Sequence, residues 1–373
     1  MIIGVDGSRY RENDATGVEW YSYFIIKELM RLTAERAHEL KLKIYVGDED
    51  SAHWNLMPGV EVKVVEAKRL WTLRALSKEI KHSPIDVLFI PSHVLPLFRP
   101  KKSVITIHDV AFCHFKEVYG FFQRLYLNWS TRYAVKHANV LIVPSKATKD
   151  DLVKFFQAAP GKIVVIKHGF KEPKPKPDMR LFAESDAFSY FGLSPESKYL
   201  LFVGRLESKK NLERVVEAFK LFSEKHPDYK LVLAGKRGVG AEAIIRKVNK
   251  LKLADKVVMP GYVSEEEKAT LYEYCQGVVF VSLYEGFGLP VLESFHYRKP
   301  ILVSNSSSLS EVAGDAGIVV DPMSVKEIAE GMCDLIEDSA LVGNLVARGA
   351  KRLEDYSWKD SGRETMKVLT DDL

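Results

Sequence analysis

The chain has 373 residues, of which 46% are hydrophobic, 28% charged and 11% aromatic, which is a globular composition with room for two domains. A net charge of +4 permits a phosphate-bearing ligand or weak contact with an anionic membrane, but it does not call for a nucleic-acid partner. The three cysteines are far apart and odd in number, so they support neither a disulfide framework nor a zinc knuckle, and a reducing compartment is expected.

The N-terminal sequence MIIGVDGS predicts a short apolar strand that runs into a turn. It lacks the basic start and the long apolar core of a signal peptide. No apolar run in the chain approaches the ~20 residues of a membrane-spanning helix. The expected location is therefore the cytoplasm, with peripheral contact at the inner membrane face left open.

In the first half of the chain, short runs rich in Val and Ile alternate with longer segments of helical period. The strand-like runs are 2–6, 43–47, 60–65, 87–92, 103–109, 140–145 and 162–169. The helix-like segments between them include 19–40, 70–81, 121–137 and 146–157. This alternation is typical of an α/β fold in which a buried parallel sheet is covered by helices on both faces.

The sequence KEPKPKPD at 171–178 interrupts this pattern with alternating prolines and three lysines, which favours an extended linker over an ordinary surface loop. Strand-like runs then resume at 198–205, 229–236, 256–263, 277–283, 300–305 and 317–322. The chain therefore predicts two doubly wound, Rossmann-like domains in tandem. Ligands bind such folds at the carboxyl ends of the strands, so we expect a site in a cleft between the two domains.

The first segment whose residues are suited to ligand binding is LLFVGRLESKKNLERVVEAF at 200–219. A strand ends at Gly204, the following loop carries Arg205, Lys209 and Lys210, and Asn211 is expected to cap a helix. Cationic side chains beside a helix N-terminus suit a phosphate or diphosphate. A solvated basic turn explains the same pattern equally well.

The second segment is YEGFGLPVLESF at 284–295, which follows a buried strand and opens a helix in which Pro290 suits the first turn. Gly286 and Gly288 allow the backbone to approach a ligand, and the free N–H groups at the helix start favour an anion. Glu285 lies in the loop and Glu293 about one turn into the helix. Each carboxylate can accept two hydrogen bonds from a diol.

A third segment, 117–139, carries aromatic residues at helical spacing, and basic residues lie between them. The aromatic residues are Phe122, Tyr126, Trp129 and Tyr133, and the basic residues are Arg124, Arg132 and Lys136. The favoured interpretation is an aromatic core stripe with a solvated basic face. The alternative is an amphipathic surface for a lipid-linked acceptor.

An ordered series of motifs in the second half resembles the retaining nucleotide-sugar glycosyltransferases of family 4, which have the GT-B fold. The series is VGRLESKKNL, AGK, PGYVSEEE, YEGFGLPVLES and SNSSSLSEVAGDAGIVVDP, dense from Leu200 to Pro322. A looser match in the first half runs through TGVEWYSYFIIKEL, PSHVLPL, ITIHDVAFCHFKE and VPSKATKDDL. The resemblance implies a GT-B protein whose two Rossmann-like domains face each other across a cleft.

The resemblance also implies roles for individual residues. Arg205 and Lys210 would bind the donor diphosphate, and Glu293 would bind the ribose. Glu285 would hold hydroxyls of the donor sugar, and His108 would face that sugar from the other domain. The remaining donor contacts would come from the amides around Phe287, Gly288 and Leu289, from Tyr262 and Val263 beside the base, and from Gly17 at the diphosphate. The family usually has a glycine pair where this chain has the single Gly17 of TGVE.

The implied activity is retaining, metal-independent transfer of a hexose, with mannose or glucose favoured, from a GDP- or UDP-linked donor to a glycan or lipid-linked saccharide. No cofactor is expected, because the cationic side chains and helix amides can neutralise the leaving diphosphate. Residues 1–170, joined by a C-terminal helix over 357–373, would form the acceptor side; 171–178 would be a hinge, and 179–356 the donor-binding domain. The alternatives are a non-catalytic nucleotide-sugar binding protein and a GT-B-like sugar-nucleotide epimerase.

Overall fold

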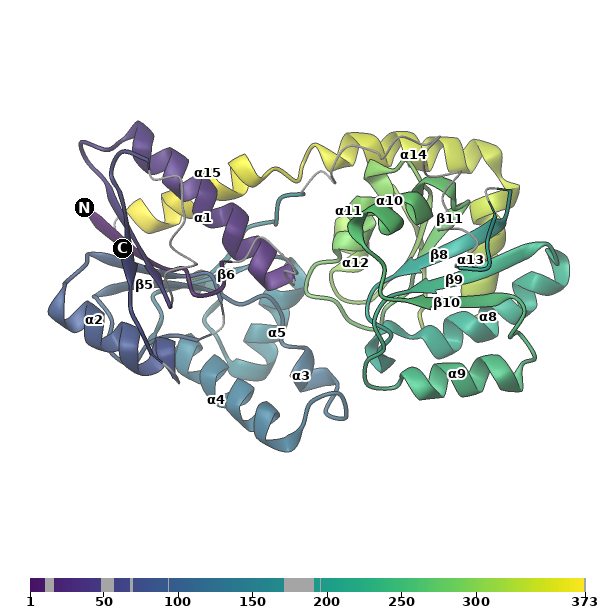
Figure 1. Cartoon of the computed structure of the whole chain (residues 1–373), viewed down its shortest axis with the longest axis horizontal. Coiled ribbons are helices and arrows are strands. Elements are labelled where there is room, and N and C mark those ends of the chain that lie inside the picture. The colour runs from purple at the N-terminus through teal and green to yellow at the C-terminus, as the bar shows by residue number, and fades with distance from the viewer. Residues whose placement is uncertain are drawn as a thin grey trace. The chain divides into compact units, whose positions relative to one another are not determined.

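The computed structural model describes residues 1–10, 17–47, 57–67, 70–92, 94–170, 191–194 and 196–371. The chain divides into two compact units (Figure 1). Unit 1 comprises Met1–Gly169 and Tyr356–Leu373, and unit 2 comprises Phe170–Asp355. The expected linker at 171–178 lies outside the described residues.

Unit 1 contains a seven-stranded sheet in the order β3-β2-β1-β4-β5-β6-β7. Every neighbouring pair in this sheet is parallel. Its strands are β1 (Ile2–Asp6), β2 (Lys41–Val46), β3 (Val60–Val64), β4 (Val87–Ile90), β5 (Lys102–Thr106), β6 (Val140–Val143) and β7 (Ile163–Val165). Each expected strand of the first half is therefore present, as the alternation of apolar runs and helical segments predicts.

Helices cover both faces of this sheet, and alternate residues of each strand face two separate cores. In β4, for example, Phe89 contributes to one core and Leu88 to the other. The helical segments before residue 166 are α1 (Gly17–Glu35), η2 (Trp71–Leu76), α2 (Ser77–His82), α3 (Ala111–His114), α4 (Phe121–His137), α5 (Lys146–Phe156) and η3 (Pro160–Lys162). The helix expected over 70–81 begins as a π-helical turn, η2, and continues as α2.

Unit 2 contains a six-stranded parallel sheet in the order β10-β9-β8-β11-β12-β13. Its strands are β8 (Lys198–Val203), β9 (Tyr229–Ala234), β10 (Val257–Gly261), β11 (Gly277–Phe280), β12 (Ile301–Ser304) and β13 (Ile318–Val320). Across the sheet of each unit, the first five strands of that unit lie in the order third, second, first, fourth, fifth, which is the doubly wound order.

The helices of unit 2 alternate with its strands. They are η4 (Ser208–Lys210), α8 (Leu212–Lys225), α9 (Ala241–Lys250), α10 (Glu265–Tyr274), α11 (Leu289–His296), α12 (Leu309–Ala313), α13 (Val325–Glu337) and α14 (Ser339–Leu353). None of the helices in the described part of the chain is long and apolar enough to cross a membrane.

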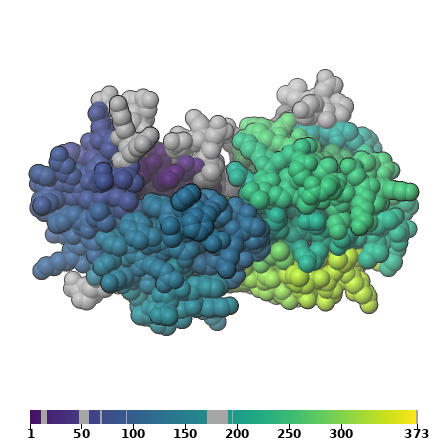
Figure 2. All heavy atoms as spheres, turned by 90° about the horizontal axis from the view of Figure 1, so that it is seen from below, coloured from purple at the N-terminus to yellow at the C-terminus, as the bar shows by residue number. Residues whose placement is uncertain are grey.

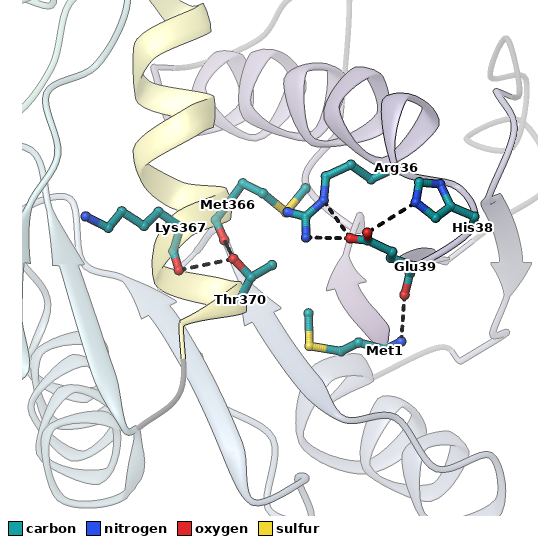
Figure 3. A network of polar contacts seen from close by, with 7 residues as sticks. All are labelled: Met1, Arg36, His38, Glu39, Met366, Lys367 and Thr370. Atoms are coloured by element: carbon teal, nitrogen blue, oxygen red, sulfur yellow. Dashed lines mark hydrogen bonds and ion pairs between the residues drawn. The ribbon is translucent and has the colours of Figure 1, made fainter.

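The last helix, α15 (Trp358–Thr370), belongs to unit 1 and packs along α1. As expected, Ser357 caps it, because the Ser357 hydroxyl accepts a hydrogen bond from the Asp360 amide. Met366 and Leu369 enter the core that lies under α1. Figure 3 shows Met366 beside Arg36, which donates to the Glu39 carboxylate at 2.8 Å. The N-terminal amine of Met1 donates to the Glu39 carbonyl, also at 2.8 Å.

The helix expected over 121–137 has those bounds, but the favoured interpretation of its aromatic residues as a core stripe is wrong for Phe122, Tyr126 and Trp129, which are exposed. Tyr133 is partly buried and packs against the core. The buried residues of α4 are Ser130, Thr131 and Ala134, which are all small. Phe122 is 82% exposed and Trp129 is 43% exposed. The small residues allow α4 to lie close to the body of unit 1, so the large aromatic side chains of the opposite face point to solvent.

Candidate functional site

The candidate site lies in unit 2 where the strand order reverses, between β8 and β11. In doubly wound sheets the loops after two such strands diverge to opposite faces and leave room for a ligand at their carboxyl ends. The loops after β8 and β11 are joined by a backbone hydrogen bond from the Leu283 amide to the Lys209 carbonyl, 2.8 Å long. This bond fixes the register of the two sequence motifs on which the predicted site depends.

Lys210 and Glu285 form an ion pair across these two loops, in which Lys210 Nζ donates to Glu285 Oε1. Their side chains are only 12% and 13% exposed. The Lys210 amine also lies over the ring of Phe280, 5.3 Å from its centroid. The sequence motifs assigned Lys210 to the donor diphosphate and Glu285 to the donor sugar, whereas in the structure the two side chains are paired with each other.

Serine residues after β12 fix the loop that carries Glu285. The Ser307 hydroxyl accepts from the Glu285 amide at 2.8 Å. The Ser308 hydroxyl lies 2.9 Å from the Glu285 carbonyl and 2.7 Å from the Phe287 carbonyl. The backbone from Glu285 to Phe287 is therefore held in place before any ligand arrives.

Glu293 is held by two side chains from α10. Lys268 Nζ donates to Oε1 of Glu293 at 2.8 Å, and the Tyr272 hydroxyl donates to Oε2 at 2.9 Å. A carboxylate has about four acceptor positions, so Glu293 retains capacity for a diol. Burial opposes the charge on Lys268, but Glu293 and Glu265 outweigh it and raise the pKa of Lys268. Burial and the Glu293 charge also raise the pKa of Tyr272, so its hydroxyl keeps its proton and donates.

Gly288 precedes α11 and has a φ of 111°, which L-residues with side chains rarely adopt. A Cβ built at this position would lie 2.6 Å from Leu309 Cδ2. Leu289 begins α11 and Pro290 follows in its first turn, as the sequence predicted. The turn at Gly288 thus starts α11 just after β11, and the first N–H groups of a helix lack intrahelical partners and can bind an anion.

The remaining predicted donor contacts of unit 2 lie on neighbouring loops. Arg205 is exposed, and its Nε lies 3.6 Å from a Glu207 oxygen. Tyr262 is exposed and carries Lys236 Nζ over its ring, 4.4 Å from the centroid. Val263 is buried beside it. Both Arg205 and Tyr262 therefore present their side chains to solvent at the carboxyl ends of the strands.

Asn211 departs from its expected role. It occupies the position before α8, but with a φ of 62° and no hydrogen bond from its side chain to the helix amides. Instead, its Nδ2 donates to the Pro322 carbonyl at 2.7 Å and its Oδ1 accepts from Arg214 at 3.0 Å. The left-handed backbone turns the side chain away from the helix, so Asn211 ties the β8–α8 loop to the segment after β13.

Two predicted residues, His108 and Gly17, lie in unit 1. His108 follows β5 and is buried, with Nε2 2.9 Å from the Pro91 carbonyl. Because a carbonyl only accepts, Nε2 carries the ring proton. The His108 ring also packs edge-on to Tyr21, with 4.8 Å between centroids. Gly17 is exposed and begins α1.

One group of described residues could hold a metal ion: His226, Cys333 and Glu337, whose ligand atoms lie within 4.8 Å of one another. They are found at the C-terminal ends of α8 and α13, away from the loops that follow the strands. His226 Nε2 is already 2.7 Å from a Glu337 oxygen. This group is separate from the residues predicted to bind a donor.

The sequence analysis missed the residues that orient the two glutamates: Lys268, Tyr272, Ser307 and Ser308. Lys268 and Tyr272 are four residues apart, so they share one face of a helix, and this spacing is a readable signal. Nothing in that spacing identifies Glu293 as their partner, because the contact depends on the packing of α10 against α11. The serine run was part of the motif SNSSSLSEVAG but carried no assigned role.

Two doubly wound units with the same strand order define the GT-B class of α/β fold, and solved glycosyltransferases share it. A sucrose-phosphate synthase from Thermosynechococcus elongatus has a TM-score of 0.71 and 18% identity, and the match covers 99% of this chain and 98% of that one. HepE of Anabaena, solved with UDP-glucose, has a TM-score of 0.69 and 16% identity, with 99% and 100% covered.

Family models extend this likeness from fold to sequence. The model for "Glycosyl transferases group 1" matches residues 186–352, and the model for "Glycosyltransferase Family 4" matches residues 17–171. The chain therefore belongs to these glycosyltransferases. Among its curated relatives, the O-antigen chain mannosyltransferase B of Escherichia coli is 26% identical over 381 residues, covering 95% of each chain.

Proposed function

We propose that this glycosyltransferase is a retaining hexosyltransferase, which moves a hexose from a nucleotide-diphosphate sugar to a glycan or lipid-linked saccharide. The observation that carries the proposal is the pair of glutamates at the strand ends, each fixed by a lysine. Lys210 holds Glu285, and Lys268 holds Glu293. Such pre-oriented carboxylates suit hydroxyl-rich ligands, because they keep free acceptor positions while their ion pairs hold them in place.

In the proposed donor complex, Glu293 binds the ribose and Glu285 binds hydroxyls of the hexose. Arg205, Lys210 and the first amides of α11 neutralise the diphosphate. Lys210 has three N–H donors, so it can bind a phosphate oxygen and keep Glu285 as a partner. The backbone beside Tyr262 and Val263 borders the base. His108 and Gly17 belong to unit 1, and their contacts to the donor stay predictions.

The proposed reaction breaks the bond between the anomeric carbon and the diphosphate oxygen, and the acceptor oxygen bonds to the same face of the sugar. The acceptor's proton passes to the departing phosphate oxygen. The fixed positive charges stabilise the negative charge that develops on the diphosphate, a form of stabilisation worth ~3 kcal/mol per donor in related cases. This mechanism uses no protein carboxylate as a nucleophile and no metal ion.

The relatives favour two donors. The mannosyltransferase of Escherichia coli supports mannose, by analogy a GDP-linked donor, and the Anabaena structure contains UDP-glucose. We propose that unit 2 binds the donor and unit 1 the acceptor, and that the reaction takes place in the cytoplasm. No nucleic-acid partner enters this proposal.

A donor panel tests the proposed function. The full chain is incubated with GDP-mannose, UDP-glucose and related sugar nucleotides, together with short mannose- and glucose-ended acceptors, and products are identified by mass and anomeric coupling in NMR. We expect a retained glycosidic bond with one donor, and unchanged turnover in a chelator. The chelator tests for a metal requirement, because the carboxylates of the sequence Asp48-Glu49-Asp50 could bind a divalent cation.

Other outcomes distinguish the alternatives. Nucleotide-sugar binding without transfer or hydrolysis would indicate a binding protein. An isomerised sugar nucleotide formed without an acceptor would indicate an epimerase. An inverted product, or activity that requires a divalent cation, would contradict the proposed mechanism while leaving the transferase class intact.

A further inference from the structure

Helix α4 presents an unusually exposed apolar face on unit 1. Its exposed large side chains are Phe121 (67%), Phe122 (82%), Leu125 (60%), Tyr126 (41%) and Trp129 (43%). Residues 122, 125, 126 and 129 follow the spacing of a single helix face. The rings of Tyr126, Trp129 and Tyr133 form an aromatic row, with centroids 6.1 Å apart between Tyr126 and Trp129 and 5.6 Å between Trp129 and Tyr133.

The exposed face extends beyond the helix. Leu97 and Phe98, which are 53% and 44% exposed, lie in the loop between β4 and β5. This loop joins the end of the row, because Arg99 donates to the Tyr133 hydroxyl at 3.0 Å and lies over its ring. In Figure 1 α4 runs along the lower margin of unit 1, and blue atoms of this part of the chain face the viewer in Figure 2, which is seen from below.

The charge around this face has one sign. Arg124, Arg132 and Lys136 lie on α4, and no aspartate or glutamate occurs between Phe121 and His137. In the turn before α4, Lys116 and Glu117 offset each other. An aromatic face rimmed by basic residues is the pattern of a helix that lies in the interface of an anionic bilayer. An interface with a second protein has no comparable need for a helix free of acidic residues.

The exposed face adjoins a cavity of about 460 Å³ in unit 1. The cavity lies beyond the carboxyl ends of β1 and β4, where the strand order of this sheet reverses. Ser8, Arg9, Thr72 and Ser92 supply polar groups to its wall, and Tyr126 of α4 belongs both to this wall and to the aromatic row. A polar ligand group in the cavity would therefore lie next to the apolar face.

We propose that the exposed face of α4, together with Leu97 and Phe98, docks on an anionic lipid bilayer and so brings the adjacent cavity to the head of an acceptor anchored in that bilayer. This inference rests on the proposed function and narrows its acceptor to a lipid-linked saccharide. The aromatic side chains enter the interface between headgroups and acyl chains, and the exposed residues Arg132 and Lys136 beside them contact anionic headgroups. The cavity receives the polar head of the acceptor.

The test measures binding of the full chain to vesicles by flotation, without donor or acceptor. We expect binding to phosphatidylglycerol vesicles, with a blue shift of tryptophan fluorescence, and much weaker binding to phosphatidylcholine vesicles. The double variant Phe122→Ser/Trp129→Ser should lower the partition coefficient by about tenfold or more, because two aromatic anchors are lost. Arg132→Gln/Lys136→Gln should remove most of the preference for anionic vesicles.

Leu221→Ser is the matched control, because Leu221 is 45% exposed on α8 in unit 2. It should leave vesicle binding unchanged. Wild-type protein that does not bind anionic vesicles, or variants that bind as the wild type does, would overturn the inference. Ultracentrifugation without vesicles tests the alternative of a dimer. If the wild type is a dimer and the Phe122→Ser/Trp129→Ser variant a monomer, the face would instead bind a second copy of the chain.

These outcomes are separable from the proposed function. A negative vesicle assay leaves transfer to soluble acceptors untouched, since no substrate is present in the assay. A negative donor panel likewise leaves vesicle binding untouched.

Discussion

At the scale of single residues, Glu293 shows how the site depends on side chains remote in sequence. Lys268 and Tyr272 each bind one oxygen of its carboxylate. We expect Glu293→Ala to weaken binding of the nucleoside diphosphate strongly. Tyr272→Phe should weaken it by about 1 kcal/mol, because one orienting hydrogen bond is lost. Isothermal titration calorimetry with GDP and UDP measures both effects.

Glu265→Gln provides the control for this pair of variants. Glu265 also binds Lys268, at 3.0 Å, but its side chain is mostly exposed. Nucleotide affinity should therefore stay near the wild-type value. Equal losses in Glu265→Gln and Glu293→Ala would show that the charge around Lys268, rather than a ribose contact, determines affinity.

Lys210 tests the electrostatic part of the mechanism. Lys210→Met should lower kcat by a factor that corresponds to a loss of about 2–4 kcal/mol of transition-state stabilisation, because the departing diphosphate loses a fixed positive charge. The neighbouring variant Lys209→Met controls for the loss of a cation from the same loop. Steady-state kinetics with the active donor separates the two, and similar kcat values for both variants would refute the role of Lys210.

Asp6 makes a prediction about pH. This buried residue ends β1, and burial raises its pKa above the ordinary value of 3.8, although the Ser8 amide and the Thr72 hydroxyl partly offset that shift. The folded state therefore holds this proton more tightly than the unfolded chain, so its ionisation reduces the free energy of unfolding as pH rises. Asp6→Asn removes this effect.

We expect the stability of Asp6→Asn relative to the wild type to increase as the pH rises above the ordinary carboxyl pKa of 3.8, measured by urea denaturation. A stability difference for Asp6→Asn that is independent of pH would contradict the raised pKa.

At the scale of elements, the turn into α11 depends on Gly288. Gly288→Ala places a Cβ on a backbone with a φ of 111° and 2.6 Å from Leu309. We expect a loss of about 1–2 kcal/mol in the stability of unit 2, together with weaker nucleotide binding. Thermal denaturation and calorimetry measure the two effects.

Gly343→Ala is the complementary variant, because Gly343 lies in α14 with no atom within 4 Å of the added Cβ. It should stabilise the protein by about 0.5–1 kcal/mol. A Gly288→Ala variant that behaves in the same way would show that the turn needs no glycine.

The sequence predicts the elements well, for a physical reason that α4 makes clear by contrast. Buried parallel strands are nearly continuous apolar runs, so their positions can be read directly, as for 140–143. In α4 the period predicts a helix but cannot tell which face is buried. The aromatic side suggested a core, whereas the fully buried residues are the small Ser130, Thr131 and Ala134, flanked by the partly buried Leu127, Tyr133 and Val135.

The candidate site was predictable to a similar extent. Glu285, Glu293 and Lys210 lie at strand ends or at the start of a helix, and their motifs identified them. The partner of each carboxylate was not predictable, because it is set by how α10 packs against α11 and by how the loops after β8 and β11 meet. Sequence spacing determines neighbours within a helix, but not between helices.

At the scale of the whole molecule, the C-terminal helix completes the fold of unit 1. Leu369 is fully buried in the core under α1, although it lies more than 300 residues after β1 in sequence. Leu369→Ala should therefore destabilise unit 1 by about 2–5 kcal/mol. All five tryptophans lie in unit 1, so tryptophan fluorescence follows the unfolding of that unit alone.

Leu221→Ala, at an exposed position of unit 2, should leave this fluorescence transition unchanged. If Leu369→Ala also left it unchanged, α15 would contribute little to the stability of unit 1.

The most direct test of the central claim is a crystal structure of the protein with the nucleoside diphosphate of its active donor. We predict the ribose on Glu293, and the diphosphate between Lys210, Arg205 and the first amides of α11. A nucleotide bound elsewhere, with Glu285 and Glu293 still paired only to Lys210, Lys268 and Tyr272, would contradict the assignment of this site.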